Sequence, residues 1–573
     1  MKYLITLLGA LAAVSNLLAQ SKVSIDLQNA PANPAIKVIV QFNRPPGQTQ
    51  LNAVSLLGGL LGLDLNLGLV NTLAYTISSS AIPALAANAD VKYISPDRSL
   101  TGSLEFANPT VNADLAYKSG YTGSGGLLGA LLGSATVAII DSGVTDHPDL
   151  HGLLLSRLVY SQSFVPGNSS TADAYGHGTH VAGIVAGNAS QSSSNSLHTF
   201  RGIAPGAGIV NLRALDANGS GSDSTVIAAI GRAIALKSQY NIRVINLSLG
   251  RPVFESYLLD PLCQAVEQAW KAGIVVVVAA GNEGRNDTAG THGYGTITSP
   301  GNDPYVITVG AMKDMLTANR GDDQIASYSS KGPSLIDHIV KPDLLAPGNR
   351  IVSLAVGGLL QKQGGAADQV LLSYYQKNSP NSPSPYYYKL SGTSMAAPMV
   401  SGAAALLLGK SPSLTPDQVK IILMKTATKA FPAVSNVTDP DTNMTYTSHY
   451  DLFTVGAGYL DVWAALNYTT VPPTGAATSP IAVYNPANST ISLLRDSSAV
   501  WGDSAVWGDS GAFSMSAVWG SSVFVSGASA VWGDSAVWGD SAVWGASAVW
   551  GDSAVWGDST TANAEALMIA GEE

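Results

Sequence analysis

The chain has 573 residues, of which 46% are hydrophobic and 12% are charged, and it contains 59 glycines. This composition suits a large buried core with many tight turns and excludes a disordered protein. The formal net charge is −10, but nine of the 39 acidic residues follow residue 500, and no Lys or Arg follows Arg495. The rest of the chain is nearly neutral and has no basic surface for nucleic acid, so we expect no nucleic-acid partner.

The N-terminus has the pattern of an export signal. Met1-Lys2 is followed by a mostly apolar run from Leu4 to Leu18 and by the small residue Ala19. This predicts a secretory signal peptide over residues 1–20, with a short membrane anchor as the alternative. No later apolar stretch reaches spanning length, so we expect a mature chain without a transmembrane segment. We expect it to be secreted or otherwise extracytoplasmic, with attachment to the cell surface left open.

Residues 21–104 form the first predicted unit after the signal peptide. Strand-like runs occur at 36–42, 73–78 and 91–95, with a short helical stretch at 82–87. This order predicts a small α+β domain.

Residues 105–470 alternate buried apolar strands with helical stretches. The strands are predicted at 136–140, 209–212, 244–249, 274–280 and 305–309. Such alternation predicts an α/β fold with a mostly parallel central sheet and helices on both of its faces. Cys263 is the chain's one cysteine, so no intrachain disulfide can form. Its apolar helical surroundings favour a core residue over a reactive thiol.

Three segments follow this region. Residues 471–498 are rich in proline and predict a linker or a small irregular unit. Residues 499–559 repeat AVWGDS, and 560–573 form an acidic end. The repeat carries eight of the ten tryptophans, namely Trp501, Trp507, Trp519, Trp532, Trp538, Trp544, Trp550 and Trp556. A six-residue period spreads these rings around a helix, whereas an extended chain keeps them on one face. A poorly ordered adhesive segment and a β-solenoid of hexapeptides both remain open.

Three blocks carry residues suited to catalysis. Asp141 ends the apolar strand AIID, where a carboxylate reaches the rim of a parallel sheet. His177 begins an apolar helix in the block HGTHVAG, and His180 in the same block fits a structural role better. Ser394, in SGTSMAAP, stands at a helix N-terminus, where unpaired N–H groups favour developing negative charge.

A fourth block, AAGNEG, follows another strand and contains Asn282, whose amide can donate to an oxyanion. A serine hydroxyl is a weak nucleophile near neutral pH and needs a base within hydrogen-bond reach. An imidazole can take that proton, and a carboxylate can hold the imidazole in its productive tautomer. One such residue indicates nothing alone, but the four ordered blocks together indicate nucleophilic catalysis.

The blocks DSG, HGTHVAG, AAGN and GTSMAAP resemble the signatures of the subtilisin-like serine proteases, the subtilase family. INLSLG (245–250), YSSKGP (328–333) and KPDLLAPG (341–348) are similar to further stretches of that family. The resemblance covers about residues 105–470. It implies an α/β fold and endoproteolysis of protein or peptide substrates through an acyl-enzyme.

The resemblance also implies roles for individual residues. Asp141, His177 and Ser394 would be the catalytic triad, and Asn282 the oxyanion donor. Ser248, Leu249 and Gly250 would pair with an extended substrate, and Ala279, Ala280 and Gly281 would form the opposite wall of the specificity pocket. Arg251 departs from the family pattern, in which many relatives have a second glycine. That departure leaves open the access to the pocket and its charge preference.

The N-terminal unit also has a family counterpart. VKYISPD (91–97) resembles the closing strand of an inhibitory propeptide, which implies a zymogen over residues 21–104 that is cut between about Ser99 and Phe106. An unrelated N-terminal domain is the alternative. No cofactor is expected for catalysis. The family often binds structural calcium, but no ligand set here has distinctive spacing, and Asp146, Asp149 and Asp173 fit solvated turn residues equally well.

The tryptophan repeat raises an alternative from a different class of function. Exposed aromatic rows can hold glycans, surfaces or partner strands, so the alternative is an adhesion protein with a vestigial protease body. The complete set of catalytic blocks argues against a vestigial body. An active protease whose tail mediates surface attachment or self-association combines both observations.

Overall fold

A computed structural model gives the fold. It describes residues 22–24, 27, 35–45, 60–66, 71–96, 99–100, 108, 110–122, 135–152, 155–193, 197–288, 290–315, 317, 319–365, 368–439, 444–485, 490–494 and 512–514. The predicted signal peptide, most of the predicted cleavage segment and the repeat tail, except residues 512–514, lie outside the described residues. Predictions about them therefore stay predictions.

The N-terminal unit is a small antiparallel sheet with one short helix. Its strands are β1 (Ile36–Phe42), β2 (Leu60–Asn66), β3 (Thr72–Ile77) and β4 (Val91–Pro96), in the order β2-β3-β1-β4, and its helix is α4 (Ile82–Ala86), preceded by η1 (Ser79–Ala81). It has its own core, in which Val38, Tyr75 and Ile94 are buried. The predicted strands and helix are confirmed, whereas β2 has no counterpart among them.

The central sheet has eight strands. In spatial order they are β13 (Gln324–Ile325), β12 (Ile307–Lys313), β11 (Val275–Ala279), β10 (Ile242–Leu247), β6 (Thr136–Asp141), β8 (Gly208–Arg213) and β7 (Leu158–Ser163), and β14 (Leu344–Pro347) also pairs with β12. All pairings are parallel except that of β13 with β12. Every residue of β6, β8, β11 and β12 is buried, as expected for strands covered on both faces. The predicted α/β architecture is confirmed.

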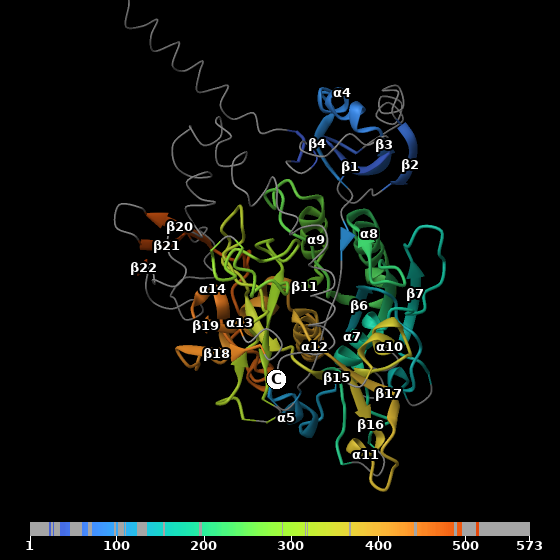
Figure 1. The fold of residues 1–573 in the computed structure, drawn as a ribbon, viewed down its shortest axis with the longest axis vertical. Helices are drawn as coiled ribbons and strands as arrows, with labels where there is room; N and C mark the ends of the chain where they lie inside the picture. Colours follow the sequence, from blue (N-terminus) through green and yellow to red (C-terminus); the bar gives the residue numbers. More distant parts are fainter. Residues whose placement is uncertain are drawn as a thin grey trace, which may run out of the picture.

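Helices cover both faces of this sheet (Figure 1). Helices α7 (His177–Ala186) and α12 (Thr393–Lys410) pack against each other on one face, and α8 (Asp223–Tyr240) and α9 (Pro261–Lys271) pack together on the other. Helix α12 is apolar all round, and its residues 393–408 are buried, which places it in the centre of the body. None of the helices in the described part of the chain is long and apolar enough to cross a membrane.

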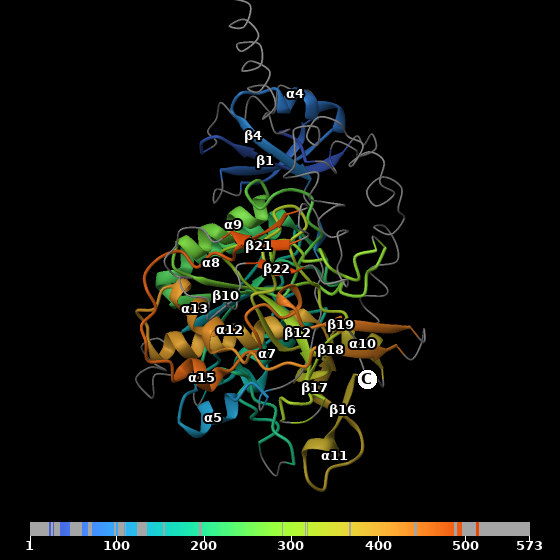
Figure 2. The ribbon, with the colours of Figure 1, turned by 90° about the vertical axis from the view of Figure 1, so that its left-hand side faces the viewer.

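The N-terminal unit lies beside α8 and α9, as Figure 2 shows at the top of the molecule. The Nε2 atom of Gln41 donates a hydrogen bond to the carbonyl oxygen of Leu259 (2.6 Å), just before α9 begins. The unit is therefore in contact with the large domain.

Smaller elements surround the central layers. The helices are α5 (Ala113–Lys118), η2 (Pro148–Leu150), α10 (Leu359–Gly364), α11 (Leu372–Tyr375), α13 (Pro416–Thr426), α14 (Leu452–Val455) and α15 (Val462–Leu466). A three-stranded sheet joins β15 (Ile351–Leu354), β17 (Pro383–Leu390) and β16 (Gln369–Leu371), and β18 (Val434–Thr438) pairs with β19 (Thr445–His449).

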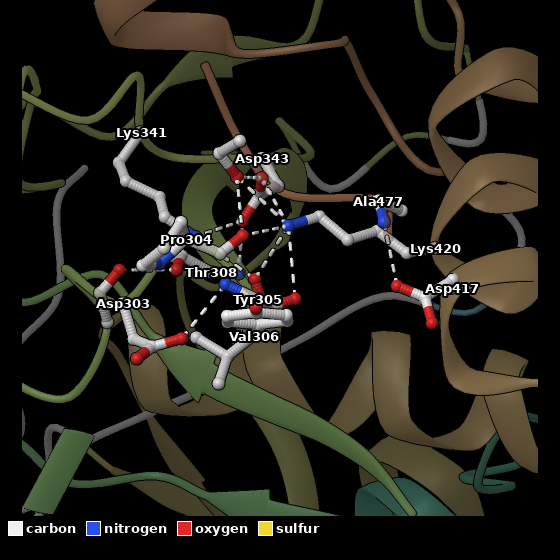
Figure 3. A network of polar contacts seen from close by, with 12 residues as sticks. Asp303, Pro304, Tyr305, Val306, Thr308, Lys341, Asp343, Asp417, Lys420 and Ala477 are labelled. Carbon is white, nitrogen blue, oxygen red and sulfur yellow. Dashed lines mark hydrogen bonds and ion pairs between the residues drawn. The ribbon is translucent and has the colours of Figure 1, made fainter. Parts of the chain in front are cut away.

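The segment predicted as a linker is packed against the large domain. Its strands β20 (Ile481–Asn485) and β21 (Thr490–Leu494) form a sheet with β22 (Ala512–Ser514). Ala477, Ala482 and Ile491 are buried in the same core as the central sheet. Figure 3 shows the buried network beneath this segment, in which Asp343 contacts both Lys341 and Lys420. The linker interpretation is wrong for the described part, because prolines there end regular structure without ending the packing.

Cys263 lies in α9, which begins directly after the N-cap residue Asp260. The cysteine is fully buried, and its thiol donates to Oδ1 of Asn302 (3.3 Å). Burial raises the pKa of this thiol well above its usual value. The prediction of a core residue is therefore supported, because a reactive cysteine needs an accessible thiolate.

Candidate active site

Asp141 and His177 form a buried pair. Asp141 is the last residue of β6, and His177 is the first residue of α7. The Nδ1 atom of His177 lies 2.6 Å from Oδ1 of Asp141, and neither side chain is exposed. A carboxylate can only accept in this contact, so the proton lies on Nδ1. Nε2 is then the imidazole atom that can take a proton from another group.

Glycines allow the start of α7 to approach the end of β6. A Cβ atom on Gly178 would lie 2.2 Å from the carbonyl oxygen of Gly143 and 3.0 Å from Cβ of Asp141. Gly143 itself has φ +120°, in the region that L side chains rarely adopt. A side chain at Gly178 would therefore push the start of α7 away from Asp141, and one at Gly143 would collide with the backbone of Thr171 and Ala172.

Asp173 supports this pair, and the sequence analysis did not find that role. Its carboxylate accepts from the hydroxyl of Ser142 (2.8 Å) and from the backbone N–H groups of Gly176 and Thr179 (2.7 Å each). It therefore joins the turn after β6 to the first turn of α7. Burial raises the pKa of Asp173 above its usual value, although these donors act to lower it. The available signal was its position, four residues before His177.

Ser394 is the second residue of α12 and is 3% exposed. Gly392 precedes the helix with φ 137°. The backbone carbonyl of Ser394 accepts from the hydroxyl of Ser248 (2.5 Å), which anchors the start of α12 beside residues 248–250. Because α7 and α12 pack together, Ser394 and His177 start two neighbouring helices.

Asn282 lies beside the residue before Ser394. Its Oδ1 atom accepts from the backbone N–H of Thr393 (2.9 Å) and from the Thr393 hydroxyl (3.0 Å). The same hydroxyl accepts from the N–H of Gly281 (3.1 Å). These contacts fix the orientation of the amide, so that Nδ2 is its donating end. An amide held in this way is suited to stabilise an oxyanion near Ser394.

His180 lies apart from the buried pair. Its Nε2 atom contacts the carbonyl oxygens of Ile351 (3.2 Å) and Tyr388 (3.3 Å), and its ring packs edge-on against the ring of Tyr388. Burial lowers the pKa of His180 well below its usual value. A buried, neutral imidazole between backbone groups fits the structural role expected from the sequence.

The short strand before α8, which was not expected from the sequence, pairs with a segment of the N-terminal region. Strand β5 (Ser99–Leu100) is antiparallel to β9 (Gly221–Ser222), with Ser99 opposite Ser222. Strand β9 directly precedes α8. The run GSGS (219–222) was the available signal, since small residues leave backbone groups accessible to another strand.

Ser248, Leu249 and Gly250 directly follow β10, and Ala280 and Gly281 directly follow β11. Thr298 lies between these two runs. A Cβ atom on Gly250 would lie 2.4 Å from its Oγ1, and one on Gly281 would lie 2.8 Å from its Cγ2. The backbone N–H of Thr298 donates to the carbonyl of Ala280 (3.0 Å). Thr298, which the sequence analysis did not single out, is therefore adjacent to both runs.

The side chain of Arg251 is fully buried, and its charge is matched by carboxylates. Its Nε atom lies 3.0 Å from Oδ1 of Asp223, and its Nη2 atom lies 2.8 Å from Oδ1 of Asp260. The backbone of Arg251 pairs in both directions with that of Ser299 (3.0 and 2.8 Å). The guanidinium is therefore engaged within the protein.

The three acidic residues considered for calcium differ from one another. Asp146 has an exposed carboxylate that contacts His151. Asp149 and Asp173 are buried, which excludes the alternative of solvated turn residues for both. Asp149 accepts from the hydroxyls of Tyr387 (2.5 Å) and Ser190 (2.8 Å). Among the described residues, no group of three or more His, Cys, Asp or Glu side chains could hold a metal ion.

Comparison with known proteins agrees with this arrangement. Residues 133–458 match the Subtilase family (Peptidase_S8). The chain is 35% identical to the serine protease AprX of Bacillus subtilis (strain 168) over 368 residues, which are 62% of this chain and 73% of that protein. It is 34% identical to subtilisin E of the same strain over 364 residues, 63% of this chain and 76% of subtilisin E. Subtilisin DY of Bacillus licheniformis is 35% identical over 327 residues, 57% of this chain and 92% of that protein.

The family match covers more than half of the chain, and it includes the strands and helices that position Asp141, His177, Asn282 and Ser394. The chain therefore belongs to the subtilase family and is a subtilisin-like serine protease.

Proposed function

We propose that Ser394, His177 and Asp141 are the catalytic triad of this endopeptidase and that Asn282 is its oxyanion donor. The observation that carries the proposal is the 2.6 Å contact between His177 Nδ1 and Asp141 Oδ1, because two residues from separate sequence blocks meet in a buried pair. The orientation of the Asn282 amide beside Thr393 supports the assignment of the donor.

The chemistry follows from these positions. The Ser394 hydroxyl attacks the carbonyl carbon of a peptide bond while Nε2 of His177 takes its proton. Asp141 keeps the ring oriented and stabilises the imidazolium. The Asn282 amide and the Ser394 backbone N–H stabilise the negative oxygen of the tetrahedral intermediate. His177 then gives the proton to the leaving amine, which leaves an acyl-enzyme. Water, activated by His177, releases the second product and restores Ser394.

The substrate is proposed to bind as an extended strand between two runs of the protein. We call residues 221–222 and 248–250 the two substrate strands. The pairing of Ser99–Leu100 with Gly221–Ser222 supports the first, since it shows that this strand accepts an antiparallel partner. Recognition through the main chain places few demands on the substrate's sequence. Thr298 and the walls at Ala280 and Gly281 are proposed to select one side chain.

The enzyme is proposed to be made as a zymogen with residues 21–104 as an inhibitory propeptide. Two observations support this. The unit contacts Leu259 through Gln41, and its own residues Ser99–Leu100 pair with the first substrate strand. Substrate and propeptide would then compete for the same backbone groups until the chain is cut between about Ser99 and Phe106.

Export and the repeat tail are part of the proposal but rest on sequence. The apolar N-terminus supports secretion or another extracytoplasmic location. The AVWGDS repeat supports attachment to a surface or self-association. Deletion of residues 499–573 should reduce surface retention or oligomer size, and no change in either would exclude this role.

The test of the triad uses the full chain and its Ser394→Ala variant. The unchanged protein should hydrolyse casein, react with a serine-directed phosphonate and cut itself near residue 100, as mass spectrometry would detect. The variant should do none of these while keeping the same circular dichroism spectrum. Asn282→Ala should retain phosphonate labelling and lose roughly 10²–10³-fold in kcat, the effect that loss of such a donor has in a subtilisin. Hydrolysis by folded Ser394→Ala would exclude the assignment.

A further inference from the structure

Arg251 occupies a junction between the two proposed substrate strands. It directly follows residues 248–250, which form the second strand. The Nε atom of Arg251 donates to both carboxylate oxygens of Asp223 (3.0 and 3.2 Å). Asp223 directly follows the first strand at Gly221–Ser222. The ion pair therefore connects the residue after one strand to the residue after the other. Both side chains are fully buried.

The other nitrogen atoms of the guanidinium extend this junction. Nη2 donates to Oδ1 of Asp260 (2.8 Å), and Nη1 donates to the carbonyl of Pro252 (3.1 Å). Asp260 is the N-cap of α9, where it also accepts from the backbone N–H of Leu262 (2.9 Å). The starts of α8 and α9 are thus held to one cation.

The same cluster of contacts includes Ser299, the residue next to Thr298. The hydroxyl of Ser299 donates to Oδ2 of Asp260 (2.7 Å), and the backbone of Ser299 pairs with that of Arg251. Movement of Arg251 would therefore shift Ser299 and, with it, the Thr298 side chain between Gly250 and Gly281.

We propose that Arg251 is a positioning residue that sets the spacing of the two substrate strands and fixes Thr298 between the pocket walls. The proposal rests on the function proposed above. This chain supplies Asp223 and Asp260 to receive the buried cation at this position. A planar guanidinium can serve Asp223 and Asp260 from different edges at once, which the single ammonium of lysine cannot do in the same geometry.

The experiment compares a long and a short substrate in Arg251→Met and Arg251→Lys variants. A tetrapeptide anilide engages both substrate strands, whereas an acetylated single-residue ester engages only the pocket and the catalytic groups. Active enzyme is counted by phosphonate titration, so losses in folding or maturation do not enter kcat/KM. The ratio of kcat/KM for the long substrate to that for the short one should fall about 10–100-fold in Arg251→Met, because small displacements of a bound substrate cost that much. Arg251→Lys should restore part of the ratio.

A second variant and a control keep the test informative if Arg251→Met fails to mature. Asp223→Asn retains the shape of the carboxylate and the pair between Arg251 and Asp260, and it should lower the ratio in the same direction. Arg320→Met is the matched control, since Arg320 pairs with Asp461 (2.9 Å) in another part of the domain. It should lower thermal stability and leave the ratio unchanged. An unchanged ratio in all Arg251 and Asp223 variants would exclude the positioning role, whereas absence of phosphonate labelling in the unchanged protein would exclude the proposed function instead.

Discussion

The large domain contains two fully buried charge networks with opposite balances. Around Arg251, one cation meets the carboxylates of Asp223 and Asp260, with Glu255 at 3.8 Å. Around Asp343, one carboxylate meets two cations, Lys341 at 2.7 Å and Lys420 at 3.1 Å. The first network lies between segments proposed to bind substrate. The second lies beneath the C-terminal segment (Figure 3).

The contacts of the second network are mainly with backbone. Lys420 donates to the carbonyls of Pro304 (2.9 Å) and Val306 (3.0 Å), and Ser479 donates to Asp343 (2.5 Å). Burial alone would raise the pKa of Asp343, but the two lysines hold it below its usual value. Buried ion pairs contribute little net stability, whereas loss of one partner is costly. We therefore expect the first network to fix the geometry of the substrate strands and the second network to fix the geometry of the C-terminal segment.

The largest expected effect is the loss of stability caused by substitution of Asp343. Asp343→Asn removes the one carboxylate that two buried lysines share. Unfolding free energy should fall by about 3–5 kcal/mol, the usual cost of leaving a buried charge unpaired. Thermal unfolding in the Ser394→Ala background, which prevents self-digestion, would measure it. In the active background, the long-to-short substrate ratio should stay constant, and a change in that ratio would remove the distinction between the networks.

A matched pair of serine substitutions tests the same distinction more finely. Ser479→Ala and Ser299→Ala each remove one hydroxyl that donates to a buried carboxylate, Asp343 or Asp260. Each should lower the unfolding free energy by about 1.5–3 kcal/mol, typical of a hydrogen bond to a charged group. Only Ser299→Ala should also lower the long-to-short ratio, by roughly fivefold, which corresponds to about 1 kcal/mol. Equal ratios in the two variants would contradict the assignment.

A further expected effect is a change in how stability depends on pH beside the second network. Burial raises the pKa of Asp303 to about 8, and the like charge of Glu267 adds to this. Between about pH 4 and pH 8 the unfolded chain has lost this proton while the folded chain keeps it, so stability falls as pH rises through that range. Asp303→Asn keeps an acceptor for the N–H of Tyr305 (2.8 Å) and should flatten the fall. Identical slopes of melting temperature against pH would contradict this.

Much of the fold could be predicted because buried strands and helix starts have local signatures. Residues 137–140 of β6 and all residues of β11 are apolar, and each run leads to a residue of the candidate site or its near neighbour. Asp141, His177, Ser394 and Asn282 lie in blocks whose residue types and order are distinctive. The structure places Asp141 against His177 and Asn282 against Thr393, beside Ser394.

The remaining features depend on contacts between distant residues. Asp173 has no local pattern that separates a buried acceptor from a turn residue, and its role is seen only through Ser142, Gly176 and Thr179. In the sequence, Arg251 is a charged residue beside a predicted pocket. Only the structure shows that Asp223 and Asp260 surround its side chain. Prolines in 471–498 suggested a linker because local periodicity does not report the buried partners of Ser479.

The packing of residues 471–485 and 490–494 determines where a shortened form of this protease can end. Ending an expression product at residue 470 would remove Ala477, Ala482 and Ile491 from the core and strip Asp343 of its serine donor. Ending it after Leu494 would keep all of these partners. The catalytic body thus includes some two dozen residues beyond the boundary that proline content suggests, and any tail attached to it starts from a chain already fastened to the enzyme's interior.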